Sequence, residues 1–137
     1  MKSIIDTNMI VRYLIHETEE EYELAKKCID DGKVILPEVL AETIYVLEGI
    51  YKIPRKEIYK SLIDLLEDVD IENKEYYQDA LAKYADSKLD YVDWLLWERN
   101  EKYKQKIYTF DRKLKNKLSN WERVPTSLFC YLSTYVW

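Results

Sequence analysis

The stretch IIDTNMI, Ile4 to Ile10, places an acid, a hydroxyl and an amide in the middle of an apolar run. The segment KSIID predicts a short strand that ends at Asp6. A carboxylate is not expected at the end of a strand that only fills a core, because a buried charge costs free energy unless it is paired. The stretch therefore indicates a strand with a functional group at its carboxyl end.

Four more short segments of strand character follow, KVIL, VDIE, KIYTF and ERV, which begin at Lys33, Val69, Lys106 and Glu122. Longer helical patterns alternate with most of these segments, and we expect helices over residues 19–31, 38–51, 54–68, 74–86 and 89–104. Apolar strands separated by helices are typical of a parallel sheet that is covered on both faces. We therefore predict an α/β fold with a central parallel sheet, in which residues 1–137 form a single domain.

Composition excludes several classes of function. The chain has 137 residues, of which 47% are apolar, enough for one domain with a real core. Its 21 basic and 26 acidic residues leave a net charge of −5, which argues against a generic basic protein that coats nucleic acid. No apolar run reaches the length of a membrane span, and the N-terminus has no signal-type segment, so we expect a cytoplasmic protein.

The side chains available for chemistry are mostly carboxylates. A single histidine, His16, makes a Ser-His-Asp triad or a histidine-rich metal site improbable. The two cysteines lack the spacing of a zinc site, and two glycines in the whole chain exclude Gly-rich phosphate loops.

Four acids do not fit an ordinary surface pattern. Asp6 and Asp111 each follow a predicted strand, where functional groups gather in parallel sheets. Each is also a favoured helix N-cap, and that alternative stays open. A helical wheel places Asp93 on the side of Leu96 and Trp97, although it can also be the acid of a first-turn capping pair. Glu42 lies at the edge of an apolar helix face, where an ordinary flanking acid is the alternative.

These acids, from four separate segments, can converge at one edge of the sheet. Carboxylates a few ångströms apart raise one another's pKa, so a tight cluster needs divalent cations to stay ionised at neutral pH. Ligation by oxygen alone suits Mg²⁺ or Mn²⁺ and not Zn²⁺. A divalent ion that is bound by several carboxylates is a common catalytic group in enzymes that hydrolyse phosphodiesters.

The chain resembles PIN-domain nucleases, and most closely the VapC-type toxins of prokaryotic toxin–antitoxin pairs. The resemblance covers roughly residues 1–118, and residues 119–137 form a C-terminal extension that we expect to pack on the body or on a partner. The resemblance rests on the motifs IIDTNMIVRYL, LPEVLAETIYVL, LDYVDWLLW and IYTFDRKL, in that order, with 18 positions between Asp93 and Asp111.

Carried over position by position, the resemblance implies that Asp6, Glu42, Asp93 and Asp111 are the catalytic and metal-binding acids. It assigns accessory roles to Thr7, Asn8, Asp90 and Thr109. It further implies a three-layer α/β/α fold with about four to five strands, Mg²⁺- or Mn²⁺-dependent endoribonuclease activity, homodimers and inhibition by a small cognate antitoxin.

A basic segment of the sequence surrounds Asp111, the last of these acids. Residues 99–117 contain eight basic side chains and two acidic ones, although the chain as a whole is acidic. Because RNA phosphates are held mainly by Lys and Arg, this segment is a candidate RNA contact, with Arg112 and Lys113 preferred. A solvated helix face is the alternative interpretation.

Three rival functions remain open. The first is a PIN nuclease that acts in RNA processing outside toxin–antitoxin systems. The second is a phosphatase with Asp6 as nucleophile. It is disfavoured because such phosphatases usually have a second acid two positions later, where this chain has Asn8. The third is an interaction module with a vestigial acidic pocket.

Overall fold

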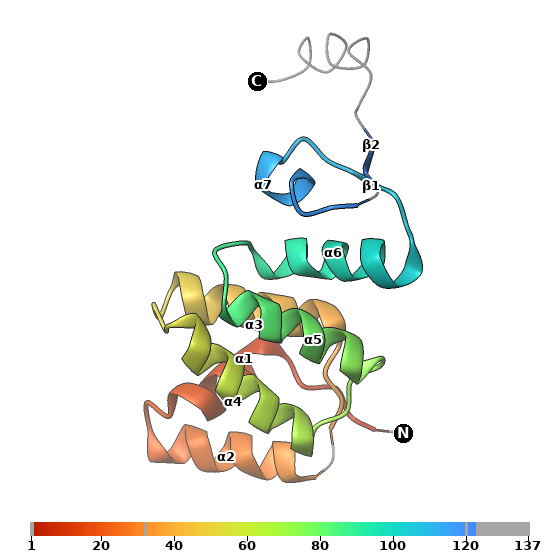
Figure 1. The fold of residues 1–137 in the computed structure, drawn as a ribbon. Helices are drawn as coiled ribbons and strands as arrows, with labels where there is room; N and C mark the ends of the chain where they lie inside the picture. The colour runs from red at the N-terminus through yellow and green to blue at the C-terminus, as the bar shows by residue number, and fades with distance from the viewer. Residues whose placement is uncertain (1, 32, 120, 123–137) are drawn as a thin grey trace, which may run out of the picture. The chain divides into compact units, whose positions relative to one another are not determined.

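The computed structural model describes residues 2–31, 33–119 and 121–122. The chain forms two compact units, Met1–Tyr91 and Val92–Trp137. In chain order the elements are α1 (Thr7–Ile15), α2 (Glu19–Asp30), α3 (Pro37–Gly49), α4 (Arg55–Asp68), α5 (Lys74–Ala85), α6 (Tyr91–Tyr103), β1 (Ile107–Tyr108), α7 (Arg112–Lys115) and β2 (Trp121–Glu122) (Figure 1). Within the described ranges, every helix is too short or too polar to traverse a bilayer.

The first unit contains a small parallel ladder. Single bridges join Ile4 to Val34 and Val34 to Asp70, so the segment around Val34 is central. Backbone hydrogen bonds of 2.8–3.1 Å support it, for example from the N–H of Ile35 to the carbonyl oxygen of Asp70. The first three predicted strand segments therefore do pair in parallel, as expected for an α/β fold.

The ladder is shorter than the sequence indicated. The described residues are mainly helical, and they contain isolated bridges and two-residue strands in place of a central sheet of four to five strands. One reason is local: α1 begins directly after Asp6, and α3 begins at Pro37, which has no N–H to donate to a ladder. Each of these short strand segments therefore has room for little more than one β-bridge.

The helices α1 to α5 enclose the core of the first unit. Packed pairs are α1 with α2, α1 with α3, α3 with α4, and α4 with α5. Each helix contributes an apolar stripe, as the helical periodicity predicted. The core includes the fully buried residues Ile10, Ile29, Leu40, Ile58, Leu62, Leu65, Leu66 and Leu81.

The second unit pairs its two short strands in parallel. Ile107 lies opposite Trp121, and Tyr108 opposite Glu122, at the positions of the last two predicted strands. The indole Nε1 of Trp97 donates a hydrogen bond of 3.0 Å to the carbonyl oxygen of Lys117, and Leu114 of α7 is buried. Most of the predicted C-terminal extension, residues 123–137, lies outside the described residues.

Candidate functional site

Asp6 is the N-cap residue of α1. Its Oδ1 accepts a hydrogen bond of 2.9 Å from the backbone N–H of Met9, and the residue is exposed. The capping alternative is confirmed for Asp6. Capping is compatible with ion binding, because the cap bond engages one oxygen of a group that has about four acceptor sites.

Glu42 is exposed on α3 and is joined to the first acidic motif. The hydroxyl Oγ1 of Thr7 donates a hydrogen bond of 3.0 Å to Oε2 of Glu42, across 35 positions of sequence. Because Thr7 directly follows Asp6, this bond links two of the predicted acidic motifs in the folded chain. Asn8, the other predicted accessory residue on α1, is exposed.

Asp93 lies in the first turn of α6 and is half-buried, in agreement with its place near the apolar side of the helical wheel. Asp90, just before α6, is exposed, and its Oδ1 lies 3.8 Å from Nη2 of Arg55. The accessory role predicted for Asp90 is therefore accompanied by a contact with an arginine.

Asp111 is the N-cap residue of α7. Its Oδ1 accepts a hydrogen bond of 2.9 Å from the N–H of Leu114, so the capping alternative is confirmed here too. Its own N–H donates to Oγ1 of Thr109 over 3.0 Å. The hydroxyl of Thr109 thus restrains the backbone that carries Asp111, which is consistent with an accessory role.

The four predicted acids divide between the two units. Asp6 and Glu42 belong to the first, and Asp93 and Asp111 to the second. Across residues 2–31, 33–119 and 121–122, no group of three or more His, Cys, Asp or Glu side chains could hold a metal ion. Convergence of the four acids therefore stays a prediction. The chemistry of the donors fits Mg²⁺ or Mn²⁺, because the pair linked by Thr7 offers carboxylate oxygens alone.

The basic segment of the second unit includes exposed cations next to Asp111. Arg112 and Lys113 are both exposed on α7. Other basic side chains of the segment contact rings or acids: Arg99 lies 5.1 Å from the ring centroid of Tyr103, Lys117 lies 5.4 Å from that of Trp94, and Lys102 lies 3.2 Å from Glu98. The two residues preferred as RNA contacts are thus accessible.

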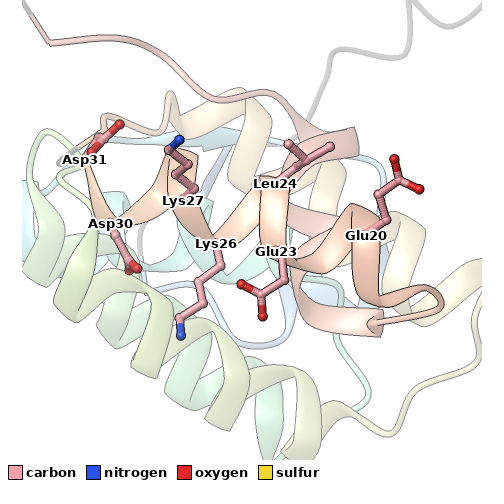
Figure 2. Close-up of a pocket in the computed structure, with 7 residues that line it drawn as sticks. All are labelled: Glu20, Glu23, Leu24, Lys26, Lys27, Asp30 and Asp31. Atoms are coloured by element: carbon pink, nitrogen blue, oxygen red, sulfur yellow. The ribbon is translucent and has the colours of Figure 1, made fainter.

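One surface hollow that the structure describes does not involve the predicted acids. It has a volume of about 540 Å³ and is lined by α2 and the residue after it: Glu20, Glu23, Leu24, Lys26, Lys27, Asp30 and Asp31 (Figure 2). A second hollow of about 300 Å³ is lined by residues of α1, α2 and α4 and by His16, again without any predicted site residue. Neither of these two hollows is lined by a predicted site residue.

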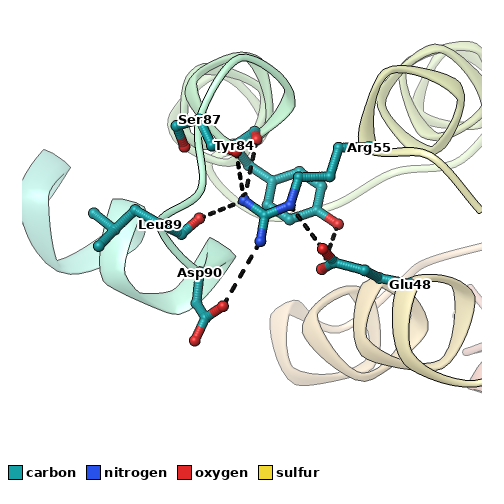
Figure 3. Close-up of polar contacts among 6 residues, drawn as sticks. All are labelled: Glu48, Arg55, Tyr84, Ser87, Leu89 and Asp90. Carbon is teal, nitrogen blue, oxygen red and sulfur yellow. Dashed lines mark hydrogen bonds and ion pairs between the residues drawn. The ribbon is translucent and has the colours of Figure 1, made fainter. Parts of the chain in front are cut away.

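Two polar residues that were not predicted from the sequence, Arg55 and Asn100, hydrogen-bond to several neighbouring groups. Arg55 binds three backbone carbonyl groups and a carboxylate (Figure 3). Asn100 is fully buried; its Nδ2 donates to the carbonyl oxygen of Gln105, and its Oδ1 accepts from the N–H of Ser119. A signal for Asn100 was present, because it lies seven positions after Asp93 and therefore on the same helix face. Arg55 has no comparable local signal.

Comparison with known proteins identifies the family. The sequence matches the PIN domain over residues 3–117, which include the strand segments of the first unit and all four predicted acids. Neither a comparison with curated proteins nor one with solved structures found a match. Since the match covers most of the chain, the protein belongs to the PIN domain family.

Proposed function

We propose that this protein is a Mg²⁺- or Mn²⁺-dependent endoribonuclease that hydrolyses RNA phosphodiesters. PIN domains are generally nucleases, and the matched range contains the complete set of predicted acids. The observation that carries the proposal is the hydrogen bond from Thr7 to Glu42, because it links two acidic motifs that are far apart in the sequence.

We assign the metal to the carboxylates of Asp6, Glu42, Asp93 and Asp111. A bound divalent ion supplies Lewis-acid chemistry, since it activates water and offsets charge on the phosphate. The chain's own contacts orient three of these acids. The N-cap bonds at the starts of α1 and α7 orient the carboxylates of Asp6 and Asp111. Thr7 restricts the rotation of the Glu42 side chain through its hydrogen bond.

The direct test is cleavage of RNA by the purified protein. We expect cleavage in Mn²⁺ or Mg²⁺ and none in excess EDTA, together with Mn²⁺ binding in isothermal titration. Absence of both cleavage and metal binding would favour the interaction module, and release of phosphate from a generic phosphomonoester would favour the phosphatase.

Thr7→Val is expected to lower kcat for RNA cleavage by roughly 10- to 100-fold, the usual cost of removing a group that orients a metal ligand. The substitution preserves side-chain shape and removes the hydroxyl that donates to Glu42. Thr43→Val is the matched control, because the Thr43 hydroxyl donates only to the carbonyl oxygen of Val39 within α3. Steady-state kinetics that show equal losses for the two variants would contradict a role for the Thr7–Glu42 bond.

Arg112→Ala and Lys113→Ala are expected to raise KM for RNA and leave kcat nearly unchanged. If each residue contacts one phosphate, each substitution should also reduce the slope of log affinity against log salt by about one. Lys56→Ala is the control, because Lys56 is an exposed cation of α4 that lies 3.9 Å from Asp86. An equal change of slope for Lys56→Ala would mean that net charge, and not a local contact, governs RNA binding.

Within this activity we further propose that the protein is a VapC-type toxin. It would act as a cytoplasmic homodimer and be inhibited by a small antitoxin. The support is the resemblance of the four motifs. An antitoxin-like reading frame next to the gene, and relief of growth inhibition by its co-expression, would favour the toxin. Their absence would favour a nuclease of RNA processing, and light scattering would give the oligomeric state.

A further inference from the structure

Arg55, the first residue of α4, lies at the centre of the polar cluster shown in Figure 3. Its side chain is only 19% exposed, and its Nε donates a hydrogen bond of 2.7 Å to Oε1 of Glu48. Its Nη1 lies 2.9 Å from the carbonyl oxygen of Ser87 and 2.7 Å from that of Leu89, with a longer contact of 3.4 Å to that of Tyr84. One guanidinium thus joins the ends of α3, α4 and α5 to the turn that follows α5.

The aromatic ring of Tyr84 and the carboxylate of Glu48 hold the guanidinium in place. The Arg55 guanidinium carbon lies 4.4 Å from the ring centroid of Tyr84, and the Tyr84 hydroxyl donates to Oε2 of Glu48 over 2.8 Å. Burial and the neighbouring Glu48 raise the pKa of the Tyr84 hydroxyl, so the hydroxyl keeps its proton as a donor at any working pH. Each group in the cluster therefore restrains another.

The turn that Arg55 binds leads directly into α6. Residues 86–90 connect α5 to α6, and Arg55 contacts this turn at Ser87, Leu89 and Asp90. The first residue of α6, Tyr91, is buried, and its ring meets the ring of Tyr84 edge to face, with centroids 6.2 Å apart. The same cluster thus sets both the path of the turn and the first residue of the helix.

We propose that Arg55 is a positioning residue for the nuclease centre: by holding the 86–90 turn it stabilises the first turn of α6, which carries Asp93. The inference rests on the proposed function, in which Asp93 is a metal ligand. Arginine suits this role because its planar guanidinium presents several donors in fixed directions, whereas a lysine ammonium is a single point charge.

The test compares Arg55→Lys with Ile58→Val, a mild truncation of a buried residue on the same helix, at a temperature where both proteins are fully folded. We expect Arg55→Lys to lower kcat by roughly tenfold or more and to raise the Mn²⁺ concentration for half-maximal rate, with KM for RNA unchanged. Ile58→Val should retain wild-type values. Arg12→Lys is a second control, since the ion pairs of Arg12 within the described part of the chain are with the side chains of Glu17 and Glu21.

A measurement without RNA separates this inference from the proposed function. Hydrogen exchange of the full-length, metal-free protein should be faster over residues 86–98 in Arg55→Lys than in Ile58→Val or the wild type. If the wild type does not cleave RNA, the proposed function fails, and the exchange result still decides whether Arg55 holds the start of α6. Equal exchange in the two variants, or equal kcat, would overturn the inference and leave Arg55 a contributor to stability alone.

Discussion

Asp6→Asn is expected to reduce kcat/KM for Mn²⁺-dependent RNA cleavage by at least about 10³-fold, which corresponds to several kcal/mol of lost metal-assisted stabilisation. In this structure the substitution is expected to remove the charge of Asp6 without removing the helix cap. Asp6 caps α1 through Oδ1, and asparagine caps helices about as well as aspartate does. The variant should therefore lose the negative charge and keep the cap, so that its melting temperature stays close to that of the wild type.

Kinetic assays and thermal unfolding of the same samples check this expectation. Asp6→Ala removes both the charge and the cap, and it should be equally inactive and less stable by about 1 kcal/mol. Thr18→Ala is the matched control, because Thr18 caps α2 in the same way, through a bond from the N–H of Glu21. It should lose stability and retain activity. Full activity of Asp6→Asn, or of Asp93→Asn, would refute the metal assignment for that residue.

Leu62→Ala is expected to lower the free energy of unfolding by about 2–5 kcal/mol, the range observed when a buried leucine is truncated. Leu62 of α4 is fully buried among the helices of the first unit, so its removal leaves a cavity as well as lost apolar contact. Leu24→Ala provides the same chemical change at a side chain that is 60% exposed on α2. That control should change the free energy of unfolding by only about 0.5 kcal/mol.

Chemical denaturation followed by circular dichroism measures both values. A large loss for Leu62→Ala and a small one for Leu24→Ala would support the packing of α4 in the core. Similar losses for the two variants would contradict the burial pattern of the first unit.

The helices were largely predictable from the sequence. The five expected helices coincide with α2 to α6 to within about two residues at each end. The signal was local, since apolar residues recur at helical spacing. The structure adds that Thr18 caps α2 and that α3 begins one residue earlier than expected, at Pro37. Parallel pairing of the first three strand segments was also expected correctly, but their length was not. Their polar flanks and the helices that begin directly after them leave room for single bridges.

The candidate site was predictable in part. The two N-cap aspartates were recognisable because the capping preference of aspartate depends on the few residues that follow it. The bond between Thr7 and Glu42 was not predicted: the resemblance gave Thr7 an accessory role without naming Glu42 as its partner, and 35 positions separate the two residues. The contacts of Arg55 gave no signal at all, because most of its partners are backbone carbonyl groups, which every residue carries.

The sequence by itself predicted five of the described helices to within about two residues, and Asp6 and Asp111 as candidate helix N-caps. Metal ligation by oxygen alone stays a prediction. Helix positions and caps depend on side-chain chemistry and on neighbours within one or two helical turns. Only the tertiary structure decided that Thr7 meets Glu42 and that Arg55 joins α3, α4 and α5 to the turn before α6. Such contacts depend on how whole helices pack, and packing brings together atoms whose separation along the chain carries no local signal.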